Sequence, residues 1–264
     1  MSEATFIFYV LVCLCMGSAM SSLSWRLPRT LEHNWRKEAH DFLALDFNDP
    51  APESFFKGRS ICPNCGSTLT PRDLMPLLSY ALNSGKCRHC KNSIPIRYPI
   101  IEAFSLVILL PLYFLTNDLT ELGLLLLLIS SLLLALIIDA EHQWIPDQCS
   151  VWVSMSAFIL MYSQGQDPSI NLLFALFAYF LIVSLRWLFL KVRKVEAIGL
   201  GDAKLLAALV FWLGPTALSP ILLMASITGM GFHILTKKQM SERIPFGPFL
   251  IISALLIFYY KAYS

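Results

Sequence analysis

The stretch LGLLLLLISSLLLALII, residues 122 to 138, decides the fold class, because only one glycine and two serines interrupt an otherwise aliphatic run. A near-continuous apolar run is what a membrane-spanning helix needs, since lipid cannot satisfy exposed polar groups. The whole chain agrees with this stretch: 56% of its 264 residues are hydrophobic and 14% are charged, and its mean hydropathy is +0.62. These values lie outside the balance of soluble domains and predict an integral membrane protein.

Further apolar segments surround this stretch on both sides. They fall near residues 5–24, 99–116, 122–138, 149–163, 169–190, 203–213, 217–236 and 246–262. We therefore predict an all-α polytopic membrane protein with about eight transmembrane helices. The segment 203–213 is short, because eleven helical residues reach only about 16 Å against a hydrocarbon core of roughly 30 Å. We nevertheless expect two crossings broken at Gly214-Pro215, since one long span from 203 to 236 would move the following basic stretch to the other side.

The positive charges are distributed unevenly. Eleven of the 20 Lys and Arg residues lie between Arg26 and Arg97, and most of the others lie in KVRK (191–194) and KKQMSER (237–243). The loops NDLTE (117–121) and QGQDP (164–168) have none. By the positive-inside rule the basic segments are cytoplasmic. The first apolar segment lacks the basic start and cleavage site of a removable signal peptide, so we interpret it as a retained span.

One sizeable polar region interrupts the apolar pattern. The expected organisation is a first span in residues 1–25, a cytoplasmic zinc-binding module in 26–98, and a membrane domain with seven further spans in 99–264. The polar region begins with a charged stretch, LEHNWRKEAHDFLAL (31–45), which we expect to be helical. A linker, DFNDPAPESFF (46–56), leads from it to a cysteine-rich segment.

Four cysteines in this segment have metal-ligand spacing. Cys62-x2-Cys65 is followed, after 21 intervening residues, by Cys87-x2-Cys90. Two short turns that each present two thiolates suit tetrahedral zinc, although the separation is slightly longer than usual. The site could simply hold a small fold together, or support a second activity. A redox role is the weakest alternative, because the charge pattern places these thiols in the reducing cytoplasm.

Several acids lie inside or at the edge of apolar segments, where acids are costly and often functional. Some have an ordinary structural explanation. Asp147 precedes an apolar run and could cap a helix. Glu102 could be the buried partner of Arg97. Glu141 and His142 belong to a loop and are expected to be solvated or to support other residues.

Asp139 and Asp202 are harder to explain structurally. Asp139 closes the apolar run LLLALIID, where the helix dipole disfavours a negative charge. Asp202 could cap the next short helix, but capping does not explain Gly199 and Gly201 before it, which permit a close approach that a side chain would block. Both acids emerge on the cytoplasmic side and could face each other. Two neighbouring carboxylates that share a proton suit peptide-bond hydrolysis of the aspartic kind, with ion-coupled transport as the main alternative.

The ordered motifs of the chain closely resemble those of the type IV prepilin peptidases, the leader peptidases and N-methyltransferases of bacterial inner membranes. The resemblance runs from about Gly17 to about Leu250. It rests on the paired cysteine knuckles, Arg97-Tyr98-Pro99-x2-Glu102, Asp139-Ala-Glu-His-x3-Pro146-Asp147, Gly199-Leu-Gly-Asp202-x-Lys204 and Ile244-Pro-Phe-Gly-Pro248.

The resemblance implies cleavage of the basic leader from type IV prepilins and type II secretion pseudopilins at the cytoplasmic face of the bacterial inner membrane. The new N-terminal residue, often Phe, would then be methylated with S-adenosylmethionine. By matching position, Asp139 and Asp202 would be the catalytic pair. The expected supporting residues are Gly199, Gly201, Lys204, Glu102 and Asp147. Cys62, Cys65, Cys87 and Cys90 would bind the zinc, and no residue is assigned to S-adenosylmethionine.

The chain departs from the family pattern at two places. Gly17-Ser-Ala-Met-Ser21 replaces the usual Gly-Ser-Phe-Leu-Asn, and Ser84-Gly85 replaces a pair of glycines. Both changes touch regions that could bear on substrate handling or methylation rather than on the aspartate pair. The expected partners are pilin-type substrates and the lipid bilayer, with no nucleic acid. The alternatives to a peptidase are a transporter that uses the acids to carry protons or metal, and a non-catalytic assembly factor.

Overall fold

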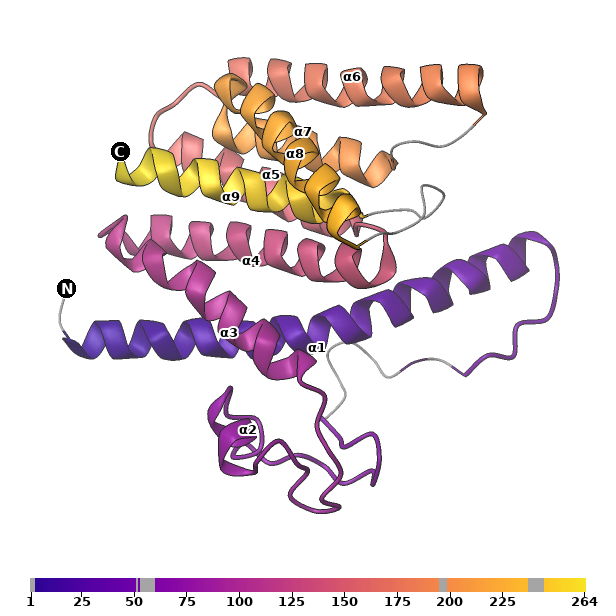
Figure 1. Cartoon of the computed structure of the whole chain (residues 1–264), viewed down its shortest axis with the longest axis vertical. Helices are drawn as coiled ribbons and strands as arrows, with labels where there is room; N and C mark the ends of the chain where they lie inside the picture. Colours follow the sequence, from indigo (N-terminus) through magenta and orange to yellow (C-terminus); the bar gives the residue numbers. More distant parts are fainter. Residues whose placement is uncertain (1–2, 51, 53–59, 195–198, 237–244) are drawn as a thin grey trace. The chain divides into compact units, whose positions relative to one another are not determined.

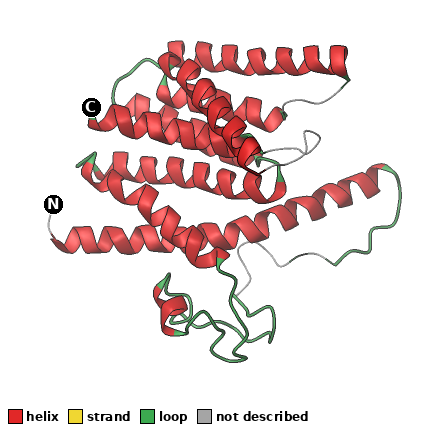
Figure 2. Ribbon diagram, in the orientation of Figure 1, coloured by secondary structure: helices red, strands yellow, loops and turns green. Residues whose placement is uncertain are grey.

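The computed structural model describes residues 3–50, 52, 60–194, 199–236 and 245–264 (Figure 1). The basic stretch 237–243, Ile244 and much of the linker 46–56 lie outside the described residues. The described part consists of helices joined by loops, and its only β-structure is two isolated β-bridges (Figure 2). The chain divides into two compact units, an N-terminal unit, Met1–Tyr113, and a C-terminal unit, Phe114–Ser264. The sequence-based division at residues 25 and 98 stays a prediction.

Each of the eight apolar segments forms a helix, and a ninth helix lies in the cysteine-rich segment, as far as the structure describes the chain. The N-terminal helices are α1 (Glu3–Phe42), α2 (Leu78–Leu82) and α3 (Arg97–Leu109), which continues as the 3-10 helix η1 (Leu110–Phe114). The C-terminal unit contains α4 (Leu119–His142), α5 (Asp147–Ser163), α6 (Ser169–Arg193), α7 (Leu200–Leu213), η2 (Pro215–Ala217), α8 (Leu218–Thr236) and α9 (Gly247–Tyr263).

Within the described residues, five helical segments are long and apolar enough to cross a membrane. They are α1, α3 with η1, α4, α6, and η2 with α8. The helices α5 and α9 have 17 residues each and α7 has 14. The predicted all-α polytopic membrane fold, with a cysteine module between the first two apolar helices, is confirmed. Eight crossings were predicted, so three of them would have to be made by the shorter helices α5, α7 and α9, and that number stays a prediction.

In the N-terminal unit α1 and α3 pack side by side in opposite directions (Figure 1). Near the start of α1, the Tyr9 hydroxyl donates a hydrogen bond of 2.7 Å to the carbonyl oxygen of Leu109 at the end of α3. Farther along α1, the Ser24 hydroxyl accepts a 2.8 Å hydrogen bond from Arg97 at the start of α3. These contacts match the antiparallel arrangement expected of two consecutive spans.

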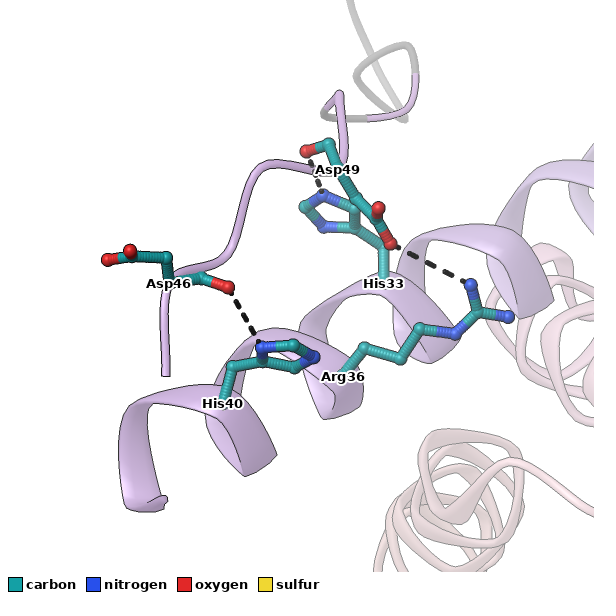
Figure 3. Close-up of polar contacts among 5 residues, drawn as sticks. All are labelled: His33, Arg36, His40, Asp46 and Asp49. Atoms are coloured by element: carbon teal, nitrogen blue, oxygen red, sulfur yellow. Dashed lines mark hydrogen bonds and ion pairs between the residues drawn. The ribbon is translucent and has the colours of Figure 1, made fainter. Parts of the chain in front are cut away.

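The charged stretch after the first span is helical as predicted, but it is not a separate helix. α1 runs for 40 residues, about 60 Å, and so extends well beyond a hydrocarbon core of roughly 30 Å. The chain then folds back along α1 (Figure 3). His40 and His33 contact the backbone carbonyl oxygens of Asp46 and Asp49 at 3.1 and 3.4 Å, and the Phe47 ring packs against both imidazoles.

In the C-terminal unit α4 and α7 are inner helices. The most apolar stretch of α4 is 61% buried, against 17% for α6 and 11% for η2 with α8. α4 packs on α5 and α9, and α7 packs on α5, α6 and α9. α7 carries a nearly unbroken set of buried residues from Ala203 to Phe211, which explains why it is apolar on all sides.

The predicted break after α7 is present at Gly214, whose φ of +83° favours glycine. The carbonyl groups freed at the end of α7 find side-chain donors from its neighbours. Asn171 on α6 donates to the carbonyl oxygen of Phe211 at 3.0 Å, and Lys261 on α9 donates to that of Leu213 at 3.2 Å. A short helix therefore ends inside this unit without leaving these two carbonyl groups unpaired.

Candidate active site

Asp139 lies in the last turn of α4, and 4% of its surface is exposed. Its Oδ2 accepts a hydrogen bond of 3.0 Å from the backbone N–H of Gly247, the first residue of α9. This N–H belongs to a helix N-terminus, which has no partner within its own helix and carries partial positive charge. The start of α9 thus offsets the unfavourable placement of an acid at the end of α4.

Gly247 leaves no room for a side chain beside this carboxylate. A Cβ atom at position 247 would lie 2.6 Å from Asp139 Oδ2 and 2.8 Å from Cδ1 of Ile145. Distances this short force one of the partners to move. The glycine therefore allows α9 to approach Asp139 closely enough for the hydrogen bond.

Asp202 occupies the first turn of α7 and is partly buried. Its Oδ2 accepts a hydrogen bond of 3.3 Å from the backbone N–H of Gly199, which precedes the helix. The predicted role of Asp202 at the helix start is therefore present, as half of a capping box. Asp202 also lies near enough to Asp139 for its charge to act on that carboxylate, so both acids belong to the same part of the C-terminal unit.

Ile145 joins the elements that carry the two acids. Its side chain is 7% exposed and lies in the loop between α4 and α5. A Cβ at Gly201 would come within 3.3 Å of Ile145 Cβ, and the same side chain limits position 247. Two glycines from α7 and α9 therefore pack on one isoleucine, which holds the helix ends around the carboxylates.

Asp147 and Lys204 form an ion pair at the edge of this site. Lys204 Nζ donates to Asp147 Oδ2 at 2.6 Å, which connects the first turns of α5 and α7. Both side chains are substantially exposed, at 41% for Lys204 and 61% for Asp147, so the pair adds little stability. The interpretation of Asp147 as a helix cap is wrong, because Pro146 occupies the cap position and Asp147 is the first helical residue.

Glu102, the remaining predicted supporting residue, belongs to the N-terminal unit. Its side chain is buried, and Oε2 accepts a 2.8 Å hydrogen bond from the backbone N–H of Leu77. On α1, Ser18 lies near this carboxylate, and a Cβ at Gly17 would lie 3.1 Å from Glu102 Cα. Glu102 thus connects α3 to α1 and to the segment before α2. Arg97 donates hydrogen bonds to the carbonyl oxygen of Ser21 and to the hydroxyl group of Ser24, both on α1.

The cysteine-rich segment contains two knuckles of the same geometry. In each, the first cysteine N–H donates to the carbonyl oxygen five residues later, at 2.9 Å for Cys62 and 2.8 Å for Cys87. An antiparallel bridge closes each turn, Ile61 with Thr68 and Lys86 with Ser93. The sulfur atoms of Cys62, Cys65, Cys87 and Cys90 all lie within 4.8 Å of one another, a donor set able to hold a metal ion.

Neighbouring donors favour the thiolate form of Cys65 and Cys87. The Ser67 hydroxyl, 2.9 Å from the sulfur, holds the pKa of Cys65 below its ordinary value. The backbone N–H groups of Cys90 and His89 lower the pKa of Cys87. The thiolate is the form that binds metals, so the turns prepare these two ligands as well as position them.

Comparison with known proteins agrees with this arrangement. Residues 11–116 match the model of the bacterial peptidase A24 N-terminal domain, and residues 126–234 match that of the type IV leader peptidase family. A type 4 prepilin-like proteins leader peptide-processing enzyme of Escherichia coli O78:H11 is 34% identical over 94% of this chain and 91% of its own length. The chain belongs to the type IV leader peptidase family. It is therefore an enzyme of the peptidase class.

Other relatives of the leader peptidase family carry both activities in their names. A prepilin leader peptidase/N-methyltransferase of Pseudomonas aeruginosa is 33% identical over 92% of this chain and 86% of its own length. One of Dichelobacter nodosus is 31% identical over 97% and 92%. No solved structure matches the chain. The two matched family regions divide between the N-terminal and the C-terminal unit, so the cysteines and the aspartates fall in different regions of the family.

Two residues of this candidate site, Ile145 and Gly247, have no role that the sequence alone predicts. The Gly247-Pro248 pair is a sequence signal for the start of a helix, because proline is favoured in a first helical turn. It does not reveal that the glycine N–H donates to an acid on another helix. Ile145 carries no signal beyond its apolar side chain.

Proposed function

We propose that the chain is a membrane aspartic endopeptidase that removes the basic leader from type IV prepilins and type II secretion pseudopilins. The observation that carries this proposal is that buried Asp139, in the last turn of α4, and partly buried Asp202, in the first turn of α7, lie near enough for their charges to interact. A membrane protein places two acids together only at considerable cost. The names of the relatives identify prepilins as the substrates of those proteins.

The chemistry follows from two carboxylates that share one proton. The ionised carboxylate takes a proton from a water molecule, whose oxygen forms the new bond to the scissile carbonyl carbon. The protonated carboxyl group gives its proton to the carbonyl oxygen, and the amine leaves with a proton when the carbon–nitrogen bond breaks. The hydrogen bonds from Gly247 and Gly199 hold the two carboxylates in position for these transfers.

We also propose that the new N-terminal amine of the cleaved substrate is methylated, with S-adenosylmethionine as the methyl donor. The support comes from the names of the relatives, several of which are N-methyltransferases. Among the residues that the structure describes, we assign none to this cofactor. The methyl group would pass to the amine that peptide cleavage has just produced.

The metal of the cysteine cluster is proposed to be zinc. Four sulfurs around one zinc at about 2.3 Å stand about 3.8 Å apart, close to the 3.9 Å between Cys62 and Cys90. The Asn64 amide donates to Cys90 at 3.6 Å, an outer contact of the kind that orients metal ligands. The metal would hold the two knuckles together as a folded module.

The basic loops support a location in the bacterial inner membrane with the acid pair and the cysteine module on the cytoplasmic side. A prepilin carries a charged leader in the cytoplasm and an apolar stem in the membrane. Its scissile bond would therefore reach the ends of α4 and α7 where they leave the bilayer. The proposed partners are these substrates and the lipid bilayer.

Mass spectrometry of a prepilin incubated with the detergent-solubilised chain tests both activities. A mass loss equal to the leader, absent with Asp202→Asn, supports the peptidase. A further gain of about one methyl group, seen only when S-adenosylmethionine is supplied, supports methyl transfer. An intact substrate after incubation with folded wild-type protein would reject the proposed function.

A further inference from the structure

A pocket of about 320 Å³ lies between α8 and α9, two helices that pack together (Figure 1). It is lined by Ser226, Gly229, Met230, His233, Phe246 and Phe249. Its size is at the lower end of the range for ligand pockets. Aromatic and thioether side chains form most of the wall, and Gly229 leaves a gap in α8 opposite the Phe249 ring.

His233 brings a partly exposed imidazole to this wall. Its Nδ1 is buried and has no hydrogen-bond partner within the described part of the chain. Most buried polar atoms in proteins are paired, and an ionisable residue within an apolar membrane segment is costly and commonly functional. A histidine in an otherwise largely apolar wall therefore favours a ligand that carries a polar group as well as an apolar side chain.

The pocket begins beside the acid site. Phe246 immediately precedes Gly247, whose N–H bonds to Asp139, and Phe249 follows within the first turn of α9. On α8 the lining runs from Ser226 to His233, two helical turns or about 10 Å. If the scissile bond of a peptide lies at Asp139, the residues next to that bond lie close to the pocket.

We propose that this pocket binds the first residues of the apolar stem of the substrate, beginning with the residue that follows the scissile bond. The proposal rests on the proposed function and adds to it a specificity site. A peptide suits the pocket better than a lipid chain, because its backbone offers both an N–H donor and a carbonyl acceptor to the partly exposed imidazole of His233. A lipid acyl chain offers neither. A large apolar side chain fills the aromatic part of the pocket.

Two glycines of α8 provide a matched test. Gly229 lines the pocket, and a Cβ there would make ordinary contact with Phe249 at 3.5 Å, whereas a Cβ at Gly231 would meet no atom within 4 Å. Gly229→Leu fills the pocket, and Gly231→Leu adds the same side chain to the same helix outside it. The substrates are two full-length prepilins that carry Phe or Ala after the scissile bond.

Gly229→Leu is expected to lower kcat/KM for the Phe substrate by about tenfold or more relative to the Ala substrate. Gly231→Leu is expected to leave this ratio unchanged. An equal loss on both substrates, or no loss, overturns the pocket proposal. Failure of the wild-type chain to cleave either substrate rejects the proposed function instead, so the two failures are distinguishable.

A second measurement does not depend on cleavage. A benzophenone amino acid placed after the scissile bond of the prepilin is photo-crosslinked to the Asp202→Asn variant, and the crosslinked peptides are identified by mass spectrometry. Crosslinks are expected in the α8 segment 226–233 or at 246–249, and they should weaken with His233→Leu. Crosslinks confined to other helices, or unchanged by His233→Leu, would contradict the proposal.

Discussion

Asp139 at the end of α4 and Gly247 at the start of α9, 108 positions apart in the chain, are joined by a buried hydrogen bond of 3.0 Å. The bond places a helix N-terminus against a carboxylate that lies at a helix C-terminus. Because these helix ends carry opposite partial charges, α9 compensates for the position of Asp139. The start of α9 is therefore part of the acid site.

The first prediction concerns the two aspartates as a unit. Asp139→Asn and Asp202→Asn are each expected to lower prepilin cleavage by about 10³-fold or more, and the double variant should be little worse than either single one. The reason is that one proton is shared between the two groups. Cleavage rates measured in detergent check this, with Asp167→Asn as the control, since Asp167 accepts hydrogen bonds from Ser169 at the start of α6 and asparagine keeps an acceptor oxygen.

The second prediction tests the close approach of α9. Gly247→Ala places a methyl group 2.6 Å from Asp139 Oδ2, so α9 must move and the hydrogen bond must lengthen. A displacement of about 1 Å in a catalytic site can cost about 10²-fold in rate, and we expect a loss of this order. Gly123→Ala on α4, where a Cβ meets no atom within 4 Å, should keep full activity. Full activity of Gly247→Ala would show that the start of α9 has no part in the acid site.

The third prediction is an order between two glycines. A Cβ at Gly201 would lie 3.3 Å from Ile145 Cβ, a contact that a shift of a few tenths of an ångström relieves. Gly201→Ala should therefore lose activity, but about tenfold less than Gly247→Ala. Comparison of kcat/KM for the two variants checks this order. A larger loss for Gly201→Ala than for Gly247→Ala would contradict the prediction.

The sequence predicts the helices of this chain well, since each apolar segment forms one and the break at Gly214-Pro215 is present. Apolar runs and helix breakers are local properties, so a local pattern identifies them. The length of α1 was missed, because a change from apolar to charged residues after residue 25 suggests a boundary. The helix nevertheless continues to Phe42.

Residue type and position also single out Asp139 and Asp202, because an acid that closes an apolar run is unusual. Their supporting contacts are a different matter. Whether Gly201 and Gly247 share Ile145 depends on how three helix ends pack, and no sequence pattern encodes that contact. Asp147 likewise lies one residue past the cap position that its sequence suggests and pairs with Lys204 instead.

The fourth prediction concerns Glu102. Its Oε2 accepts the N–H of Leu77, a residue with a φ of +58° that precedes α2. Glu102→Ala would leave this N–H without its partner, whereas Glu102→Gln retains an acceptor oxygen. Hydrogen–deuterium exchange at Leu77 should therefore be about tenfold faster or more in Glu102→Ala, which corresponds to the loss of one hydrogen bond. Exchange in Glu102→Gln should stay near the wild-type rate, and equal exchange in both variants would contradict this role.

The last prediction concerns the metal. The purified chain should contain about one zinc, and Cys62→Ser or Cys87→Ser should remove it, because a site with four thiolates loses affinity when one ligand is replaced. Cys15→Ser is the control, since Cys15 lies on α1 and outside the cysteine cluster. Removal of the metal by a chelator should expose the backbone amides of both knuckles to rapid exchange, as metal binding and folding are coupled.

Because the aspartates lie in the other compact unit, removal of the metal should lower methylation at least as much as cleavage. If removal of the metal lowered cleavage more than methylation, the cysteine module would serve the peptidase site instead.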